Sequence, residues 1–153
     1  MIHQKLRMIK IEFPKNKVKV QQHKDVHEVF DVIRKKWLLL TPEEWVRQHI
    51  LQYLLITKKY PASLIAIEKE IKLVDLKKRC DIVVYNRRSE PWMIIECKEM
   101  KVTLSENTLD QILRYHISLS AQYLIITNGS YCFGFEKREG QFIEIDCFPD
   151  FEI

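Results

Sequence analysis

Two short apolar runs separated by a polar turn stand out in the middle of the chain. Residues 81–85 and 92–95 are rich in β-branched and aromatic side chains, and residues 86–91 between them are polar. These runs predict two strands. Because the connection is short, we expect the strands to pair antiparallel, so that the start of the first lies beside the end of the second.

Two helices are predicted on either side of these strands. The first begins with Thr41 as its N-cap, Pro42 at its first position and Glu44 three residues after the cap, and its apolar periodicity ends near residues 58–61. The second is capped by Thr103 or Ser105 and extends to about residue 119. Both have an apolar stripe that can pack on a sheet.

Further short apolar segments complete the pattern. We expect core strands at residues 63–71 and 122–127, and a hairpin formed by residues 131–135 and 141–145 around 138–140. Residues 77–79 are expected to form a basic turn, residues 29–34 a short strand or turn, and residues 9–13 and 18–20 weak strands. The prediction is an α/β fold with a central mixed β-sheet flanked by helices and an additional C-terminal β-hairpin. Residues 1–25 are interpreted as an N-terminal extension and residues 26–153 as a single domain.

Composition narrows the class of protein. A chain of 153 residues with 46% hydrophobic residues can form one compact domain with a core. No apolar run approaches the roughly 18 residues that span a bilayer, so we expect a cytoplasmic protein with no membrane partner. Four cysteines without C-x-x-C spacing predict free thiols in a reducing compartment, and three glycines leave no Walker phosphate loop.

The formal charge of +4 is compatible with a phosphate-rich partner. The lysines of the first 25 residues form either a solvated face or an arm that contacts a nucleic-acid backbone. His23 and His27 stand four residues apart and could in principle share a metal, but we interpret them as part of a solvated polar segment.

Charged residues stand at the ends of the two central strands. Asp81 opens the first strand, and Glu96 and Lys98 close the second with Cys97 between them. Because side chains alternate along a strand, Glu96 and Lys98 should project from one face. Two carboxylates at one sheet edge repel each other unless a cation binds, and all-oxygen ligands suit Mg²⁺ or Mn²⁺. The alternative is a structural salt bridge between Lys98 and either acid.

These residues resemble a known nuclease pattern. Asp81 followed by Glu96-Cys97-Lys98 is similar to the PD-(D/E)xK superfamily, with Cys80 in place of its Pro. Gln111-x-x-x-Tyr115 matches the Q-x-x-x-Y motif of its RecB-like and type I restriction branches. The chain most resembles the N-terminal domain family of type I restriction enzyme R proteins, over roughly residues 29–135. The matching segments are residues 41–48, 79–85, 96–98, 111–115 and 127–129.

The resemblance implies a restriction-endonuclease-like core and a role for each matching residue. Asp81 and Glu96 would hold Mg²⁺ or Mn²⁺, and Lys98 would position the attacking water or offset charge on the phosphate. Gln111 and Tyr115 would orient the DNA backbone. Without the resemblance, this helical pair would be read as an amphipathic boundary pair.

A glutamate of the first helix is also implied at the metal site. Glu43 and Glu44 both qualify, and both have a sufficient structural role at a helix N-terminus. The candidate DNA-binding side chains are Lys78, Arg79 and Arg114, and the guanidinium of Arg79 could instead orient Asp81.

The function expected from these observations is that of a metal-dependent DNA endonuclease domain. The alternative is a nucleic-acid-binding module of the same fold that does not cut, or cuts only with partners, and a purely structural α/β protein is a third possibility. The expected partners are DNA and the motor or specificity subunits of a restriction-modification system. A homodimer is also possible.

Overall fold

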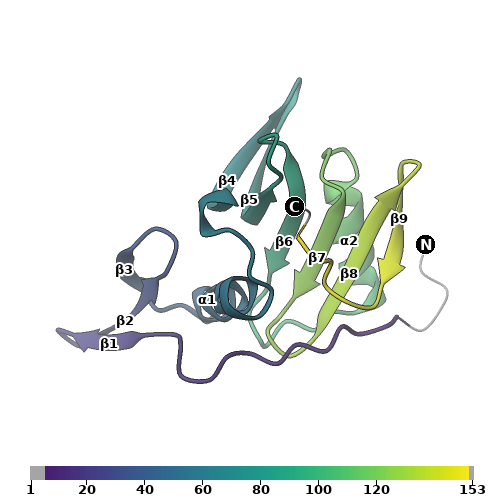
Figure 1. Cartoon of the computed structure of the whole chain (residues 1–153). Helices are drawn as coiled ribbons and strands as arrows, with labels where there is room; N and C mark the ends of the chain where they lie inside the picture. The colour runs from purple at the N-terminus through teal and green to yellow at the C-terminus, as the bar shows by residue number, and fades with distance from the viewer. Residues whose placement is uncertain (1–5, 152–153) are drawn as a thin grey trace.

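The computed structural model describes residues 6–151 and contains a six-stranded mixed sheet with a helix on each face (Figure 1). The strands lie in the order of the chain: β4 Ile65–Leu73, β5 Leu76–Tyr85, β6 Pro91–Cys97, β7 Tyr123–Thr127, β8 Cys132–Arg138 and β9 Gln141–Ile145. Only β6 and β7 pair in parallel, because a helix connects them. The predicted α/β fold, including the C-terminal hairpin of β8 and β9, is confirmed.

The pairing of β5 with β6 brings the candidate residues together. The strands are antiparallel, with Ile82 opposite Ile95 and Val83 opposite Ile94. This register places Asp81, one residue before Ile82, beside Glu96, one residue after Ile95. The expected pairing is therefore confirmed.

The two helices pack on opposite faces of the sheet. Helix α1 (Pro42–Gln52) continues into a π-helical turn, Tyr53–Thr57, and a 3₁₀ turn, Ala62–Leu64, precedes β4. Helix α2 (Glu106–His116) lies between β6 and β7. The predicted caps are present: Thr41 Oγ1 accepts a hydrogen bond from Glu44 N, and Ser105 Oγ accepts one from Thr108 N.

Alternating side chains of the central strands form two apolar clusters, one under each helix. Ile82, Val84, Met93, Ile95 and Ile125 pack with the buried face of α1. Val83, Ile94, Leu124 and Ile126 pack with Leu109 and Ile112 of α2. The central strands of the sheet are thus buried on both faces. None of the described helices has the length and apolar composition needed to cross a bilayer.

A second, smaller sheet projects from the body of the molecule (Figure 1). It consists of β1 (Val20–His23), β2 (Val26–Asp31) and β3 (Lys36–Leu39), all antiparallel. Residues 29–34, expected as a short strand or turn, form the end of β2 and the turn that follows it, and residues 9–13 form no strand. Residue 25, the proposed end of an N-terminal extension, lies in the turn between β1 and β2.

The basic segment of residues 77–79 is not a turn, as the sequence had suggested. It lies within β5, and the turn of this hairpin is formed by residues 74 and 75. Lys72 pairs with Lys77 and Glu70 with Arg79 across the hairpin. The long β4–β5 ladder overrides the turn that clustered charges suggest, because each strand supplies hydrogen-bonding partners for the other.

The chain before β1 is hydrogen-bonded to the start of β8 in the large sheet. Ile9 is buried, and its amide donates to the carbonyl oxygen of Cys132 at 2.8 Å. Gly134 makes this approach possible, because a Cβ atom there would lie 2.7 Å from Ile9 Cδ1 and 2.8 Å from Ile145 Cγ1. Cys80, Cys97, Cys132 and Cys147 are all free thiols.

Candidate functional site

Asp81 lies at the point where β5 passes the end of β6. Its Oδ2 accepts a hydrogen bond from the backbone N–H of Cys97 at 2.7 Å, and its Oδ1 lies 3.5 Å from Arg47 Nη2. Only 17% of the side chain is exposed. The carboxylate is therefore held firmly by the next strand and by helix α1.

Glu96 projects from the end of β6 toward α2. Its Oε1 lies 3.1 Å from Lys98 Nζ, and its Oε2 lies 3.6 Å from His116 Nε2. The second distance is too long for a hydrogen bond but permits an ion pair when the imidazole is protonated. The ring nitrogens of the buried His116 have no hydrogen-bond partner among the described residues. Glu96 and Lys98 thus share one side of the sheet, as strand alternation predicts.

An open pocket of about 280 Å³ lies between the end of β6 and helix α2. It is lined by Arg79, Glu96, Lys98, Gln111, Ile112, Tyr115 and His116. Gln111 and Tyr115 stand one helical turn apart and are both exposed, so their polar groups face the pocket and solvent rather than the core. The structure therefore brings five of the candidate residues to one surface depression.

Burial and neighbouring charges give Asp81 and Glu96 different pKa values. Burial, and after it the charge of Glu96, raises the pKa of Asp81 to about 7. Burial acts in the same sense on Glu96, but His116 and Lys98 outweigh it and hold its pKa below the ordinary value. Burial would lower the pKa of Lys98, but the nearby carboxylates of Glu96 and Asp81 raise it above its ordinary value. At neutral pH Glu96 is ionised, Lys98 is charged, and Asp81 is partly protonated.

The two glutamates of α1 have different surroundings. Glu44 is buried: its Oε1 lies 3.0 Å from Arg47 Nη1, and its Oε2 accepts from Gln48 Nε2 at 3.1 Å. Glu43 is half exposed, with its Oε1 3.4 Å from Arg47 Nη2. The charge of Glu43 acts on both Asp81 and Lys98. Of the two, Glu43 faces the strand ends and Glu44 faces the interior.

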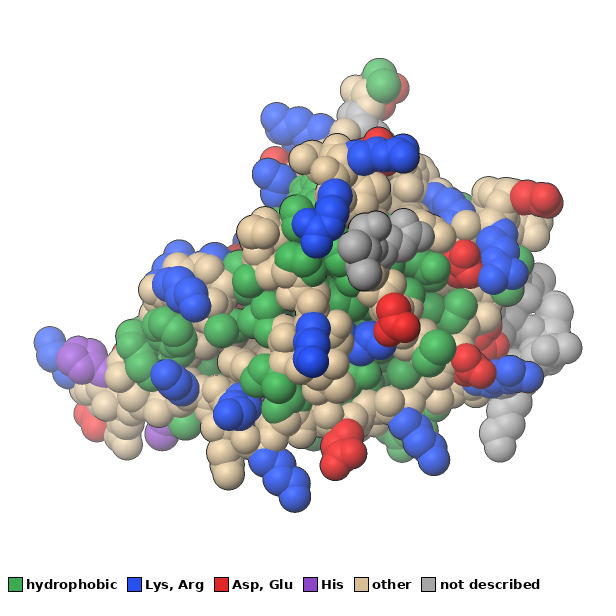
Figure 2. All heavy atoms as spheres, viewed as in Figure 1, with side chains coloured by type: hydrophobic (Ala, Val, Ile, Leu, Met, Phe, Trp, Pro, Cys, Tyr) green, Lys and Arg blue, Asp and Glu red, His purple; other side chains and the backbone are tan. Residues whose placement is uncertain are grey.

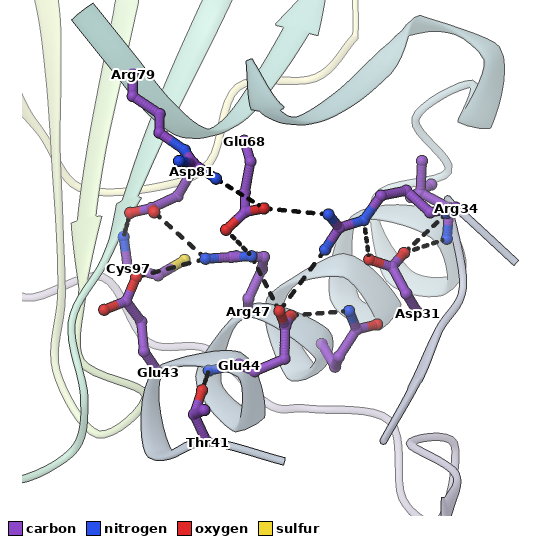
Figure 3. Close-up of polar contacts among 12 residues, drawn as sticks. Asp31, Arg34, Thr41, Glu43, Glu44, Arg47, Glu68, Arg79, Asp81 and Cys97 are labelled. Atoms are coloured by element: carbon purple, nitrogen blue, oxygen red, sulfur yellow. Dashed lines mark hydrogen bonds and ion pairs between the residues drawn. The ribbon is translucent and has the colours of Figure 1, made fainter. Parts of the chain in front are cut away.

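Arg47 is the cation on which these carboxylates converge (Figure 3). Its guanidinium is 4% exposed and lies within 3.5 Å of oxygen atoms of Glu43, Glu44, Glu68 and Asp81. The sequence interpretation gave this residue no role. Its spacing from Glu43 and Glu44 was the available signal, since residues three and four apart on a helix are neighbours.

Glu68 is a second residue to which the sequence interpretation gave no role. It contacts Arg34, Arg47 and Arg79 at 3.0 to 3.3 Å. Its backbone has φ of +51° in the middle of β4, a conformation that costs a non-glycine residue roughly 1–2 kcal/mol. The neighbouring pairs are Ile67 with Ile82 and Lys69 with Cys80, so this irregularity faces Asp81. The three arginines hold the pKa of Glu68 below its ordinary value although burial would raise it.

The candidate DNA-binding residues lie in three different environments. Arg79 is 69% exposed and borders the pocket. Lys78 is buried, its Nζ donates to Ser118 Oγ at 3.2 Å, and it lies 4.3 Å from the centre of the Tyr115 ring. Arg114 is exposed on α2. Lys78 therefore supports Tyr115 from within, and the DNA-binding role of all three residues stays a prediction.

A family model for the N terminus of type I restriction enzyme R proteins matches residues 42–149. The chain belongs to this family. The match includes α1, the six-stranded sheet and α2, and it ends beyond β9. Sheet β1–β3 precedes the matched region. No curated protein gives a significant match to the chain.

The donor groups of this R-protein N-terminal domain can be compared with what a divalent cation needs. Mg²⁺ and Mn²⁺ are bound through one or two carboxylates, with water and substrate oxygens completing the shell. Asp81 and Glu96 supply two neighbouring carboxylates, and burial, followed by the charge of Glu96, raises the pKa of Asp81. Three or more His, Cys, Asp or Glu side chains do not cluster around any metal-sized site in residues 6–151. The residues thus fit a cation that shares its shell with water and phosphate, not one enclosed by protein.

Replacing Glu44 and Glu43 singly should separate their roles in folding. We expect Glu44→Gln to destabilise the protein by roughly 2–4 kcal/mol, because it leaves a buried arginine without its main partner. Glu43→Gln should cost less than about 1 kcal/mol, since this carboxylate is half exposed. Urea denaturation of both variants measures the difference. Equal losses of stability would contradict the assignment of Glu44 as the structural member of the pair.

The raised pKa of Asp81 predicts a pH-dependent stability in EDTA. A carboxyl group with a raised folded-state pKa contributes stability below its ordinary pKa, and this contribution is lost as pH rises through about 7. Asp81→Asn removes the titration and can still accept the Cys97 hydrogen bond. The stability of this variant relative to wild type should therefore rise between about pH 4 and pH 8, by roughly 2–4 kcal/mol.

Denaturant titrations at the two ends of this range test the expectation. Asp146→Asn, which removes a carboxylate that is 66% exposed, is the matched control. A difference between Asp81→Asn and wild type that does not change with pH would show that Asp81 is not a strained, buried acid.

Proposed function

We propose that the chain is a metal-dependent DNA endonuclease domain of a restriction system. The observation that carries the proposal is the meeting of Asp81, Glu96 and Lys98 at adjoining strand ends, beside a pocket that Gln111 and Tyr115 also line. Membership in the R-protein N-terminal family supports the restriction context. Two carboxylates and a lysine next to an open, partly cationic surface are the groups that phosphodiester hydrolysis requires.

Asp81 and Glu96 would hold the cation, Mg²⁺ or Mn²⁺. Bound there, the ion would polarise the scissile phosphate and lower the pKa of a coordinated water. The chain's contribution is to keep both acids fixed. The Cys97 amide and Arg47 hold Asp81, while Lys98 and His116 hold Glu96 in its ionised form.

Lys98 would act at the reacting phosphate. Its side chain is 35% exposed, and neighbouring carboxylates raise its pKa, so it carries a positive charge at neutral pH. An ammonium fixed beside the metal ligands would orient the attacking water and stabilise negative charge that develops in the transition state. Gln111 and Tyr115 would hydrogen-bond to the DNA backbone from the opposite side of the pocket, and Arg79 would extend the cationic rim.

Glu43 is the glutamate of α1 that we assign to this site. It is exposed at the helix N-terminus and acts electrostatically on Asp81 and Lys98. Glu44 is occupied by Arg47 and Gln48. A carboxylate in the position of Glu43 could bind a metal-bound water or the metal itself.

A second candidate function is a nucleic-acid-binding module that does not cut by itself. The observation that favours it is Arg47 Nη2, which lies 3.5 Å from Asp81 and already gives that acid a cation from the protein. A domain of this kind would bind DNA equally well in EDTA and in Mg²⁺ and would leave plasmid intact. Cutting would then depend on a motor or specificity subunit.

Incubation of the chain with supercoiled plasmid in Mg²⁺, Mn²⁺ and EDTA distinguishes the two functions. We expect nicking or linearisation that EDTA abolishes. Lys98→Ala should lower the cleavage rate by about a hundred-fold or more, the scale for removing one preorganised charge from a developing anion. The exposed neighbour Lys101→Ala is the control and should retain the wild-type rate. Cleavage by Lys98→Ala at the wild-type rate would reduce Lys98 to a salt-bridge partner.

A further inference from the structure

The positive charge of the chain is concentrated in one segment. Residues 15–36 contain seven Lys and Arg against three Asp and Glu. This excess equals the formal charge of +4 of the whole chain, so all other residues together are neutral. The segment contains β1, β2, the first residue of β3 and the turns and residues that adjoin these strands.

Most of this charge is free to meet a ligand. Six lysines of the segment are exposed, and none of them forms an ion pair with any other residue in the described range 6–151: Lys15, Lys17, Lys19, Lys24, Lys35 and Lys36. The seventh cation, Arg34, is instead paired with Asp31. His23 and His27 are also exposed. Figure 2 shows blue Lys and Arg and purple His side chains around the projecting end of the molecule, at the left of the view.

The projecting sheet is joined to the candidate active site by partly buried ion pairs. Asp31, at the end of β2, is fully buried and lies 2.7 Å from Arg34. Arg34 in turn lies 3.1 Å from Glu68, and Glu68 lies 3.3 Å from Arg47, which contacts Asp81 (Figure 3). Gln48 Oε1 also accepts a hydrogen bond from Val32 N. The sheet is therefore held in a fixed position relative to the strand ends.

We propose that sheet β1–β3 is a second DNA-contacting surface, which binds the phosphate backbone of duplex DNA beyond the cutting site. The proposal rests on the proposed DNA substrate. Duplex DNA is stiff over about 150 base pairs, so a duplex at the strand ends continues straight past the body of the protein. A rigidly attached basic projection next to α1 can meet that continuing duplex. The sheet precedes the region that the family model matches, so it lies outside the part of the chain by which the family is defined.

The composition of the surface favours DNA among the possible anionic partners. Lysines that make no ion pair and few carboxylates suit a dense, regular array of phosphates, and neutralising each phosphate releases counterions. The sheet presents no amphipathic helix with which to enter a bilayer. The ion pairs of Arg34, Glu68 and Arg47 also connect the sheet to Asp81, a residue of the site proposed for phosphodiester chemistry.

The test compares two triple variants of the full chain. Lys17→Gln/Lys19→Gln/Lys36→Gln removes three charges from the projecting sheet and the residues that lead into it. Lys59→Gln/Lys72→Gln/Arg88→Gln removes three charges from exposed positions elsewhere and is the matched control. Fluorescence anisotropy with a labelled duplex of mixed sequence, in EDTA and over a sodium chloride series, gives the affinity and its salt dependence without cleavage. Circular dichroism verifies that both variants fold.

The sheet variant should bind the duplex at least about ten-fold more weakly than wild type at moderate salt. The slope of log affinity against log salt should fall in magnitude by roughly 2–3, since each phosphate contact contributes about 0.9. The control variant should keep most of the wild-type affinity for the duplex and most of the wild-type salt slope. Equal weakening of the two variants, or no weakening of the sheet variant, would overturn the proposal.

Two further results would also overturn it. The first is a sheet variant that no longer binds anionic phospholipid vesicles or an acidic polypeptide but binds the duplex as tightly as wild type does. The other is a wild-type chain that does not bind the duplex in EDTA. The proposed chemistry is tested separately, because plasmid cleavage that EDTA abolishes and that depends on Lys98 can survive either result.

Discussion

The ion pairs of Arg47 determine how the candidate site is built. Burying carboxylates without a counter-charge costs several kcal/mol, yet Glu44, Glu68 and Asp81 are all largely withdrawn from water. One guanidinium contacts all three, together with the more exposed Glu43. Because these acids come from α1, β4 and β5, the same interaction fixes the helix against the sheet. It also leaves Glu96 and Lys98 free to face the pocket on the other side.

The same network explains the position of the projecting sheet and the strain in β4. Arg34 extends the chain of ion pairs from Glu68 to the buried Asp31 at the end of β2. Glu68 keeps an unfavourable φ of +51° because three arginines surround its carboxylate. Strain that persists beside Asp81 is consistent with a site that requires a particular arrangement of charge. The structure thus joins a basic surface and a carboxylate pair through one polar interior.

Local patterns were sufficient to predict the parts of the fold that depend on neighbouring residues. Caps at Thr41 and Ser105, strand alternation around Cys97 and the short 86–91 connection all led to the observed elements and to the meeting of Asp81 with Glu96. They failed where strand pairing decides. The basic segment 77–79 is strand because β4 pairs with it, and residues 36–39 form β3 because β2 pairs with them. The roles of Arg47, Glu68 and His116 depend on side chains up to 34 residues away, so no local spacing revealed them fully.

We propose that Asp81 and Glu96 together bind a divalent cation, and calorimetric titration of Mn²⁺ tests this assignment most directly. We expect one site in the wild-type chain, and an affinity that falls by about ten-fold or more, or about 1.4 kcal/mol, in both Asp81→Asn and Glu96→Gln. Glu136→Gln, at a carboxylate paired with Arg138 on β8, should leave the affinity unchanged. Wild-type affinity in both site variants, or no binding to the wild-type chain, would contradict the assignment of Asp81 and Glu96 as metal ligands.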